Sequence, residues 1–195
     1  ADQIQVLTPT RKGPSGTMNL NRCLQETLNP KTPDKREILW GERLFREGDR
    51  IMQTRNDYDV VWEKADGTVG TGMFNGDVGK ITQIDPSGEW LSVDFDGRSA
   101  LYGVEQLAEL DLAYAQTVHK AQGSEYRCVV LCALPSAQSL MVRGVLYTAL
   151  TRARELLVVV GDDAAIRSMA ANDRQQRRYS GLKWRLSHES GLHGN

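Results

Sequence analysis

The chain has 195 residues, of which 40% are hydrophobic and 25% are charged. This composition supports an ordinary globular core and excludes a wholly disordered chain. No apolar run approaches the roughly 18–20 residues that a membrane span needs, and the first residues have no signal-peptide pattern. We therefore expect a cytoplasmic protein with no membrane partner.

Three cysteines, an odd number without a Cys-x-x-Cys pair, argue against a disulfide framework and against a zinc ribbon. Cys128 and Cys132 lie in an apolar stretch and are interpreted as buried free thiols. No metal site is predicted in this chain.

The formal net charge of −1 conceals two parts of opposite sign. Residues 45–108 hold six Lys and Arg against twelve Asp and Glu, a balance of −6, whereas the remaining residues hold 18 against 13, a balance of +5. Only the flanking part has the sign that attracts phosphate groups.

The first elements alternate between strand and helix signals. Ile4–Leu7 predicts a short buried strand. A turn rich in Gly and Pro follows, and leucines spaced four residues apart then predict a helix over Thr17–Leu28. Residues 30–44 are interpreted as an exposed loop.

From about residue 45 the pattern changes to short strands separated by turns. Asp66-Gly67, Asn75-Gly76, Pro86-Ser87-Gly88 and Asp96-Gly97 recur about every ten residues, which is typical of β-hairpins. A segment of this length predicts a small barrel of about five strands.

After residue 110 the strand–helix alternation returns, with a basic tail from Asn172 onward. The pattern predicts an α/β fold with a parallel sheet, formed by residues 1–44 and 109–195 and interrupted by the barrel over residues 45–108. Strands are expected at 111–115, 126–134 and 156–160, and helices at 138–153 and 164–171.

The most informative segment is Ala115-Gln-Thr-Val-His-Lys-Ala-Gln-Gly-Ser-Glu-Tyr126, which crowds hydrogen-bonding side chains around one glycine. Composition alone leaves a capped surface helix as an equal alternative. The string closely resembles motif V of RecD-like superfamily 1 helicases. The resemblance implies that Thr117, His119 and Lys120 contact single-stranded DNA, whereas Gln122, Gly123 and Glu125 lie near ATP.

A second segment, Leu146-Tyr-Thr-Ala-Leu-Thr-Arg-Ala, resembles motif VI of the same family. There the arginine, Arg152 in this sequence, is implied to reach the γ-phosphate. A guanidinium suits this role because it is planar, permanently charged and able to donate two parallel hydrogen bonds. A solvated arginine at a helix end is the alternative, and it suits Arg154 better.

The segment Val6-Leu-Thr-Pro-Thr-Arg-Lys-Gly-Pro-Ser-Gly16 resembles motif IV of these helicases. The resemblance implies that Arg11 is a second phosphate-facing arginine beside Arg152, and that Thr8 and Lys12 contact DNA. A basic surface turn is the simpler alternative for Arg11.

Residues 45–108 resemble the Src-homology-3-like barrel inserted into the second RecA-like domain of RecD-type helicases. Arg55 and Asn56 are assigned to DNA binding on this likeness. The acidic balance argues against a primary phosphate-binding surface. Exposed tryptophans such as Trp62 or Trp90 could stack on bases, although barrel core is the commoner place for them.

Together these likenesses imply the C-terminal motor region of an ATP-dependent 5′→3′ DNA helicase that acts in DNA repair and recombination. No Gly-x-x-x-x-Gly-Lys-Ser/Thr loop occurs in the sequence. ATP and Mg²⁺ would thus need an N-terminal RecA-like domain of a longer chain, and this chain alone is expected to be inactive. Single-stranded DNA, that domain, and repair proteins bound through the barrel are the expected partners.

Three other functions remain open from the sequence. The chain could be a stand-alone single-stranded nucleic-acid-binding module, the matching half of a relaxase-type or viral helicase, or a scaffold that has lost its chemistry. The barrel with its Asn-Gly turn favours a RecD-type helicase over a relaxase-type or viral helicase. The retention of Arg11, Glu125 and Arg152 argues against a scaffold that has lost its chemistry.

Overall fold

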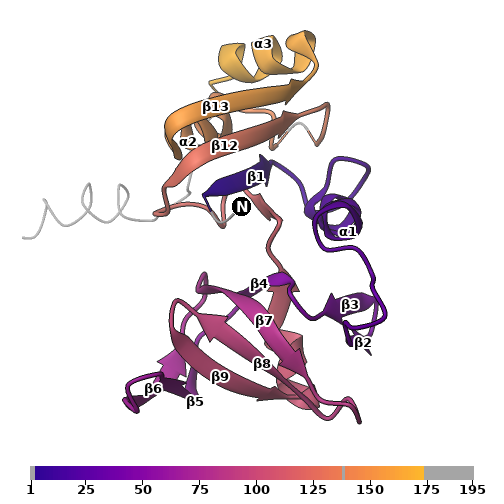
Figure 1. Cartoon of the computed structure of the whole chain (residues 1–195). Helices are drawn as coiled ribbons and strands as arrows, with labels where there is room; N and C mark the ends of the chain where they lie inside the picture. Colours follow the sequence, from indigo (N-terminus) through magenta and orange to yellow (C-terminus); the bar gives the residue numbers. More distant parts are fainter. Residues whose placement is uncertain (1–2, 138, 174–195) are drawn as a thin grey trace, which may run out of the picture.

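The computed structural model describes residues 3–137 and 139–173. Four strands, β1 (Ile4–Thr8), β11 (Ala115–Thr117), β12 (Tyr126–Ala133) and β13 (Ala153–Gly161), form a sheet in the order β11-β1-β12-β13 (Figure 1). Every pair in this sheet is parallel. The predicted α/β class with a parallel sheet is therefore confirmed.

Three helices accompany this sheet: α1 (Thr17–Leu28), α2 (Arg143–Leu150) and α3 (Asp163–Ala171). Apolar residues of α2 and α3 pack against one face of β1 and β12 in a single core cluster. The helix predicted over 138–153 is shorter, because the chain turns at Thr151 and β13 already begins at Ala153. No helix among the described residues is long and apolar enough to cross a membrane.

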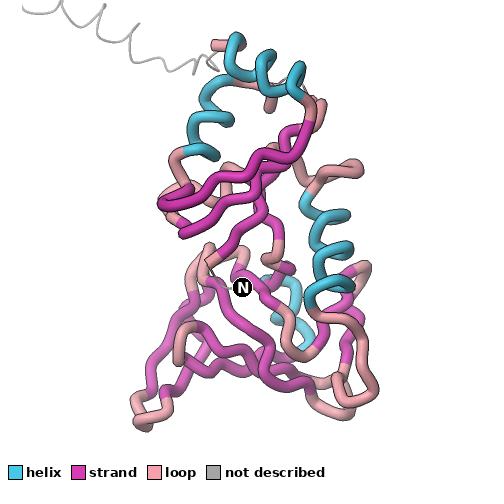
Figure 2. Tube along the Cα trace, turned by 45° about the horizontal axis from the view of Figure 1, so that its top comes forward, coloured by secondary structure: helices cyan, strands magenta, loops and turns pink. Residues whose placement is uncertain are grey.

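A second sheet of seven antiparallel strands lies beside the first, in the order β10-β4-β7-β8-β9-β5-β6 (Figures 1 and 2). It has two strands more than the predicted five, and one of them, β10, lies after residue 108, outside the predicted barrel. Its strands are β4 (Arg50–Gln53), β5 (Asp57–Lys64), β6 (Val69–Met73), β7 (Val78–Ile84), β8 (Trp90–Phe95), β9 (Arg98–Gly103) and β10 (Leu110–Leu112).

Residues 30–44, predicted as a loop, contain part of a hairpin formed by β2 (Glu37–Trp40) and β3 (Arg43–Arg46). Ile38 and Phe45 of this hairpin belong to the barrel core, as does Leu112 after the short 3-10 helix Val104–Glu109. The barrel core thus extends beyond residues 45–108 at both ends. The prediction missed this because the hairpin has too few alternating residues to register as two strands.

A buried polar network joins the two parts of the molecule at Asp49. Its carboxylate accepts hydrogen bonds from Gln25 Nε2 at 2.5 Å, Asn29 Nδ2 at 2.7 Å, the Arg46 backbone N–H at 2.7 Å and the Tyr114 hydroxyl at 2.9 Å. Burial raises the pKa of Asp49, and the hydrogen bonds from Asn29, Arg46, Gln25 and Tyr114 oppose that rise. One carboxylate therefore accepts hydrogen bonds from α1 and the residue that ends it, from the hairpin and from the segment just before β11.

We expect Gly161→Ala to destabilise the chain. A Cβ at Gly161, the last residue of β13, would lie 2.1 Å from the Ala133 carbonyl oxygen. Because the obstacle is backbone in a paired strand, the free energy of unfolding should fall by about 1–3 kcal/mol, measured by urea titration.

Gly144→Ala is the matched control, because nothing lies within 4 Å of its added Cβ and Gly144 is part of α2. An alanine there should stabilise the helix by about 0.5–1 kcal/mol. Equal effects of the two substitutions would contradict the steric argument.

Candidate nucleotide and nucleic-acid sites

One loop, residues 118–125, connects the two ends of the parallel sheet. It leaves β11 after Thr117, which pairs with Thr8 at the carboxyl end of β1, and it enters β12 at Tyr126, which pairs with Ala153 at the amino end of β13. The residue opposite Thr8 on β12 lies about six positions after Tyr126. At about 3.3 Å per residue, the loop ends are separated by roughly 20 Å along the strands.

At the amino end of β12 and β13, the loop meets Arg152. The Arg152 guanidinium donates hydrogen bonds to Ser124 O at 2.9 Å, Thr148 O at 3.1 Å and Thr151 Oγ1 at 3.1 Å. The Tyr126 N–H in turn donates to Arg152 O at 2.8 Å. All of these partners are neutral, and among the described residues no carboxylate forms an ion pair with Arg152. Its positive charge is thus held in place without being neutralised.

Gly123 and Glu125 lie at the same end as Arg152. Gly123 has a φ of +87°, the left-handed conformation that glycine adopts without strain. The Glu125 carboxylate accepts from Arg154 at 2.7 Å, and both side chains are at least half exposed. Arg154, interpreted from sequence as a solvated arginine at a helix end, instead lies on β13 and connects that strand to the loop.

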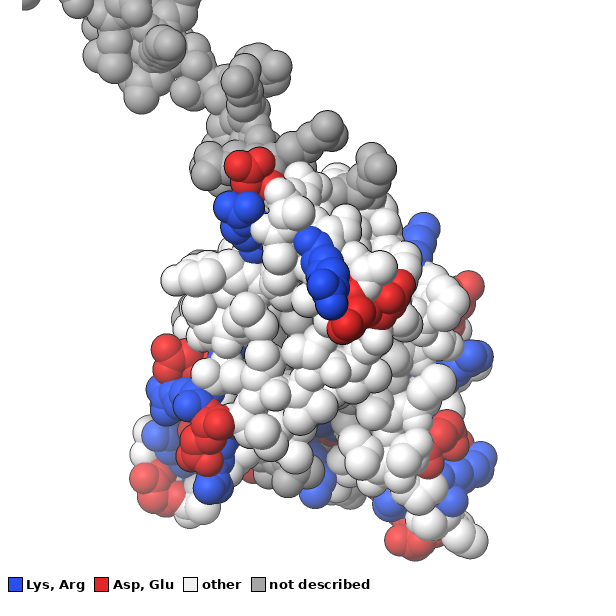
Figure 3. All heavy atoms as spheres, turned by 90° about the horizontal axis from the view of Figure 1, so that it is seen from above, with Lys and Arg blue, Asp and Glu red and all other residues white. Residues whose placement is uncertain are grey.

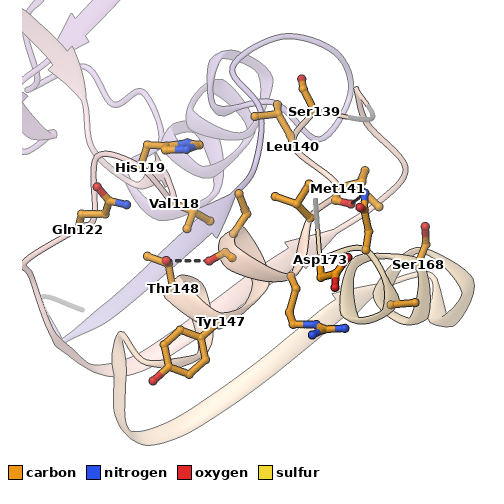
Figure 4. A pocket seen from close by; sticks show the side chains of 16 residues that line it. Val118, His119, Gln122, Ser139, Leu140, Met141, Tyr147, Thr148, Ser168 and Asp173 are labelled. Carbon is orange, nitrogen blue, oxygen red and sulfur yellow. Dashed lines mark hydrogen bonds between the residues drawn. The ribbon is translucent and has the colours of Figure 1, made fainter. Parts of the chain in front are cut away.

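An open groove of about 1340 Å³ lies between the loop and α2 (Figure 4). His119 and Gln122 line it from the loop, and Tyr147 and Thr148 line it from α2. The Thr148 hydroxyl donates to Gly144 O at 2.8 Å, so it is held against its own helix. Gln122, predicted to lie near ATP, therefore shares a groove with His119, a predicted DNA contact.

Beyond the carboxyl end of β11, the charges of Arg11, Arg43 and Asp111 all act on Lys120. Arg11 lies 3.8 Å from Asp111, and the Arg43 guanidinium stacks 5.0 Å from the Trp40 ring and donates to Leu110 O. Desolvation lowers the pKa of Lys120; the Asp111 charge opposes this shift, and the charges of Arg11 and Arg43 add to it. We call Arg11, Arg43 and Lys120 the cation cluster.

The two predicted phosphate-facing arginines follow and precede different strands. Arg11 follows β1 at its carboxyl end and lies 3.8 Å from Asp111, whereas Arg152 precedes β13 at its amino end. Arg43 was missed because its segment was interpreted as a loop. The spacing of Trp40 and Arg43 across a tight turn was the available signal.

Three other predicted DNA contacts in this region differ in their exposure. The Thr8 side chain is fully buried and its hydroxyl donates to Ser15 O at 2.7 Å, which argues against a contact with DNA. Lys12 is exposed in the turn after β1. Thr117 is half-buried, and its Oγ1 accepts from the Lys120 N–H at 3.3 Å.

The predicted DNA contacts of the barrel are already occupied by other protein groups. Arg55 forms an ion pair with Glu109. The Asn56 side-chain oxygen accepts from the Asn75 N–H at 2.9 Å and so supports a turn. Trp62 packs partly buried against the barrel core, as the more common interpretation of such residues expects, and Trp90 is half-buried.

Figure 3 shows the molecule from above, with Lys and Arg beside Asp and Glu around the rim and in one group nearer the middle, and with broad uncharged areas between these groups. Charges of opposite sign on this face therefore largely offset one another. A surface of this kind gives no strong attraction for phosphate.

Comparison with known proteins assigns the chain to a family. Residues 20–95 match the family model described as ATP-dependent RecD-like DNA helicase SH3 domain, and residues 112–160 match the UvrD-like helicase C-terminal domain. The ATP-dependent RecD2 DNA helicase of Deinococcus radiodurans is 39% identical over 174 residues, which cover 89% of this chain. The chain belongs to the RecD-like helicase family.

A second relative of this RecD-like chain is the RecD subunit of the RecBCD enzyme from Mycolicibacterium smegmatis, which is 34% identical over 95% of the chain. The chain spans only 22% of the Deinococcus protein and 29% of the Mycolicibacterium protein. It thus corresponds to one region of much longer relatives.

Solved structures of Pif1 helicases share the fold. A structure of two Pif1 helicases that unwind forked DNA matches with a TM-score of 0.56 at 18% identity, covering 98% of this chain and 45% of that one. Bacteroides Pif1 bound to single-stranded DNA matches with a TM-score of 0.53 at 18% identity, covering 96% and 46%. The predicted RecA-like fold is confirmed by these neighbours.

Proposed function

We propose that this chain is the C-terminal motor region of an ATP-dependent 5′→3′ DNA helicase. The longer protein would hydrolyse ATP between two RecA-like domains and move along single-stranded DNA. Residues 1–44 and 109–195 would form the second of these domains, with the barrel inserted between them. The relatives' lengths and names support a longer helicase, and the two ends of the parallel sheet support the division of labour.

The loop over residues 118–125 is the observation that carries the proposal. One of its ends is hydrogen-bonded to Arg152, and the other begins beside the cation cluster. Coupling between nucleotide and DNA needs an element that both sites touch. In this proposal, movement of Ser124 when ATP binds is transmitted along the loop to Lys120 and His119.

Arg152 would stabilise the charge that develops on the transferred phosphoryl group. Three neutral acceptors orient its guanidinium and leave its charge available, so little reorganisation is needed when a phosphate arrives. Gly123 would permit close approach of the backbone, and Glu125 would lie near the ribose.

The remaining parts of the nucleotide site would come from the rest of the longer protein. The carboxylate of this loop is Glu125, and it is paired with Arg154 rather than free to hold Mg²⁺. The phosphate-cradling loop and the Mg²⁺ ligands are therefore assigned to the N-terminal RecA-like domain. On this proposal the present chain does not turn over ATP alone.

The DNA contacts would be made by the groove and the cation cluster. Lys120, Arg43 and Arg11 would neutralise backbone phosphates, with Lys12 and Thr117 beside them. His119 would contact the strand in the groove next to Thr148. Thr8 would act indirectly, by holding the turn that carries Arg11.

The experiment compares the longer protein with the 195-residue chain. ATP hydrolysis stimulated by single-stranded DNA is expected from the longer protein and not from the chain. Unwinding should require a 5′ tail on the duplex substrate. ATP turnover by the chain that survives Arg152→Ala, or unwinding only of 3′-tailed duplex, would contradict the activity or the polarity, respectively.

A stand-alone single-stranded nucleic-acid-binding module is the second candidate, favoured by the presence of the whole cation cluster in this chain. A salt titration with the 195-residue chain distinguishes the two functions, because each phosphate neutralised on a single strand contributes about 0.7 to the slope of log K against log salt. The helicase proposal predicts weak binding at physiological salt, whereas the binding module predicts tight binding.

We expect Lys120→Ala to weaken binding of single-stranded DNA by the longer protein to a similar extent for all base sequences. The salt slope should fall by about 0.7, because one phosphate contact is lost. Fluorescence anisotropy at several salt concentrations measures both effects. Lys80→Ala, an exposed lysine on β7 of the barrel, is the control and should leave the slope unchanged. An equal change in both variants would contradict the assignment of the track to the cation cluster.

A further inference from the structure

One face of the parallel sheet is apolar and largely uncovered. The register aligns Ile4 with Cys128 and Leu156, and it aligns Val6 with Val130 and Val158. Because side chains alternate between the two faces of a strand, these residues share one face. We call it the open face, and it consists of Ile4, Val6, Cys128, Val130, Leu156, Val158 and Val160. The buried Cys132, opposite Val160, and Ala115, opposite Val6, continue it.

The open face is more exposed than the opposite face. Leu156, Val158 and Val160 of the open face are 55%, 39% and 52% exposed. On the opposite face Val129 and Leu131 are buried with α2 and α3, although Val159 of β13 is 39% exposed. Figure 2 shows two helices on one side of these strands. All-parallel sheets almost always have both faces covered by helices, and contiguous apolar patches on a free surface usually mark an interface.

We infer that the open face binds an amphipathic α-helix contributed by the part of the longer protein that lies outside this chain. Two observations identify the occupant. The parallel sheet favours a helical layer, since an apolar face of mostly β-branched side chains offers no polar groups to nucleic acid. The relatives extend far beyond this chain, which spans 22% and 29% of their lengths, and so hold ample sequence for such a helix.

The inference rests on the proposed function in one respect, namely that this chain is one region of a longer protein. It adds that the second RecA-like domain is incomplete without a helix from outside residues 1–195. The free chain should therefore expose a surface that is internal in the longer protein. A second copy of the chain, or the chain's own C-terminal tail, would be the rival occupants.

Thiol labelling tests the inference with two native cysteines. Cys128 lies on the open face and is half-buried, whereas Cys23 is exposed on α1 and is not one of the open-face residues. A small maleimide should modify both in the monomeric 195-residue chain. In the longer protein Cys128 should react at least about tenfold more slowly while Cys23 reacts as before, because only the open face becomes covered.

Each other labelling outcome overturns the inference. Equal reactivity of Cys128 in both proteins would mean that nothing covers the face. Protection of Cys128 in a dimeric 195-residue chain would identify a second copy as the occupant, and protection in the monomer would identify the chain's own tail. ATP hydrolysis is measured on the same longer protein to separate the two proposals. If Cys128 is unprotected but ATP is hydrolysed, only this inference is overturned. If Cys128 is protected but ATP is not hydrolysed, only the proposed function is overturned.

A substitution gives an independent readout. Val158→Glu should leave the melting temperature of the 195-residue chain nearly unchanged, because Val158 already meets solvent there. The same substitution should lower the melting temperature of the longer protein by several degrees, because it buries a charge under the helix. Val69→Glu is the control, at a 61% exposed position on barrel strand β6. A similar response of Val158→Glu in both proteins would overturn the inference.

Discussion

Replacing Arg152 by alanine in the longer helicase is expected to lower kcat for DNA-stimulated ATP hydrolysis by about a thousandfold or more, the usual effect of losing an arginine finger. The loss should fall on kcat rather than on the affinity for ATP, because the charge acts mainly on the transition state. The structural reason is the unneutralised guanidinium, held by Ser124 O, Thr148 O and Thr151 Oγ1.

Arg154→Ala is the matched control for this prediction. Arg154 lies two residues further along the chain, on β13, and its partner Glu125 neutralises its charge at the surface. Exposed ion pairs contribute about 0–1 kcal/mol, so hydrolysis should change by only a few-fold. Arg152→Lys keeps the charge but not the fork of donors, and an intermediate rate is expected. Equal losses from Arg152→Ala and Arg154→Ala would mean that both arginines act by holding the loop, and would contradict the proposed finger.

Asp49→Ala is expected to destabilise the 195-residue chain by about 3–5 kcal/mol, because it leaves several buried donors without an acceptor. Gln25, Asn29 and Tyr114 all donate to this carboxylate and belong to different parts of the chain. Urea unfolding followed by circular dichroism measures the loss. In the Asp49→Ala variant the barrel and the parallel sheet should also unfold in two separate steps, because the network that joins α1 to the barrel is broken.

Two further variants sharpen this prediction. Asp49→Asn preserves the shape but offers a single acceptor oxygen, and an intermediate loss is expected. Asp59→Ala, at an exposed position of β5, should stay within about 0.5 kcal/mol of the parent chain. A loss below 1 kcal/mol for Asp49→Ala would contradict a structural role for the network.

The sequence predicted the α/β class, the inserted barrel and the segment 115–126 because each depends on local patterns. Apolar runs identify buried strands, and Asn-Gly and Asp-Gly turns identify hairpins. The likeness to helicase motifs also identified Arg152 and the loop residues that the structure brings together, Gly123 and Glu125. These residues are neighbours across a single pair of parallel strands.

The sequence was less informative where neighbours are distant along the chain. Arg11 was predicted to face a phosphate together with Arg152, and the structure places it beside Asp111. Arg43 was overlooked, although Trp40 and the hairpin direct it toward Asp111 and Lys120. Whether a residue such as Thr8 points outward or into the core depends on packing that its own segment does not specify.

By itself, then, the sequence determined the order of the elements, the family to which the motifs belong and the chemical groups available. Only the tertiary structure decided which of those groups meet at each end of the sheet, that Asp49 joins the two parts, and that one apolar face of the sheet lacks a cover. The physical reason is one of range. Hydrophobic periodicity and turn chemistry act over a few residues. Strand register, burial and the grouping of charges depend on contacts between residues as far apart in sequence as Gln5 and Ala113.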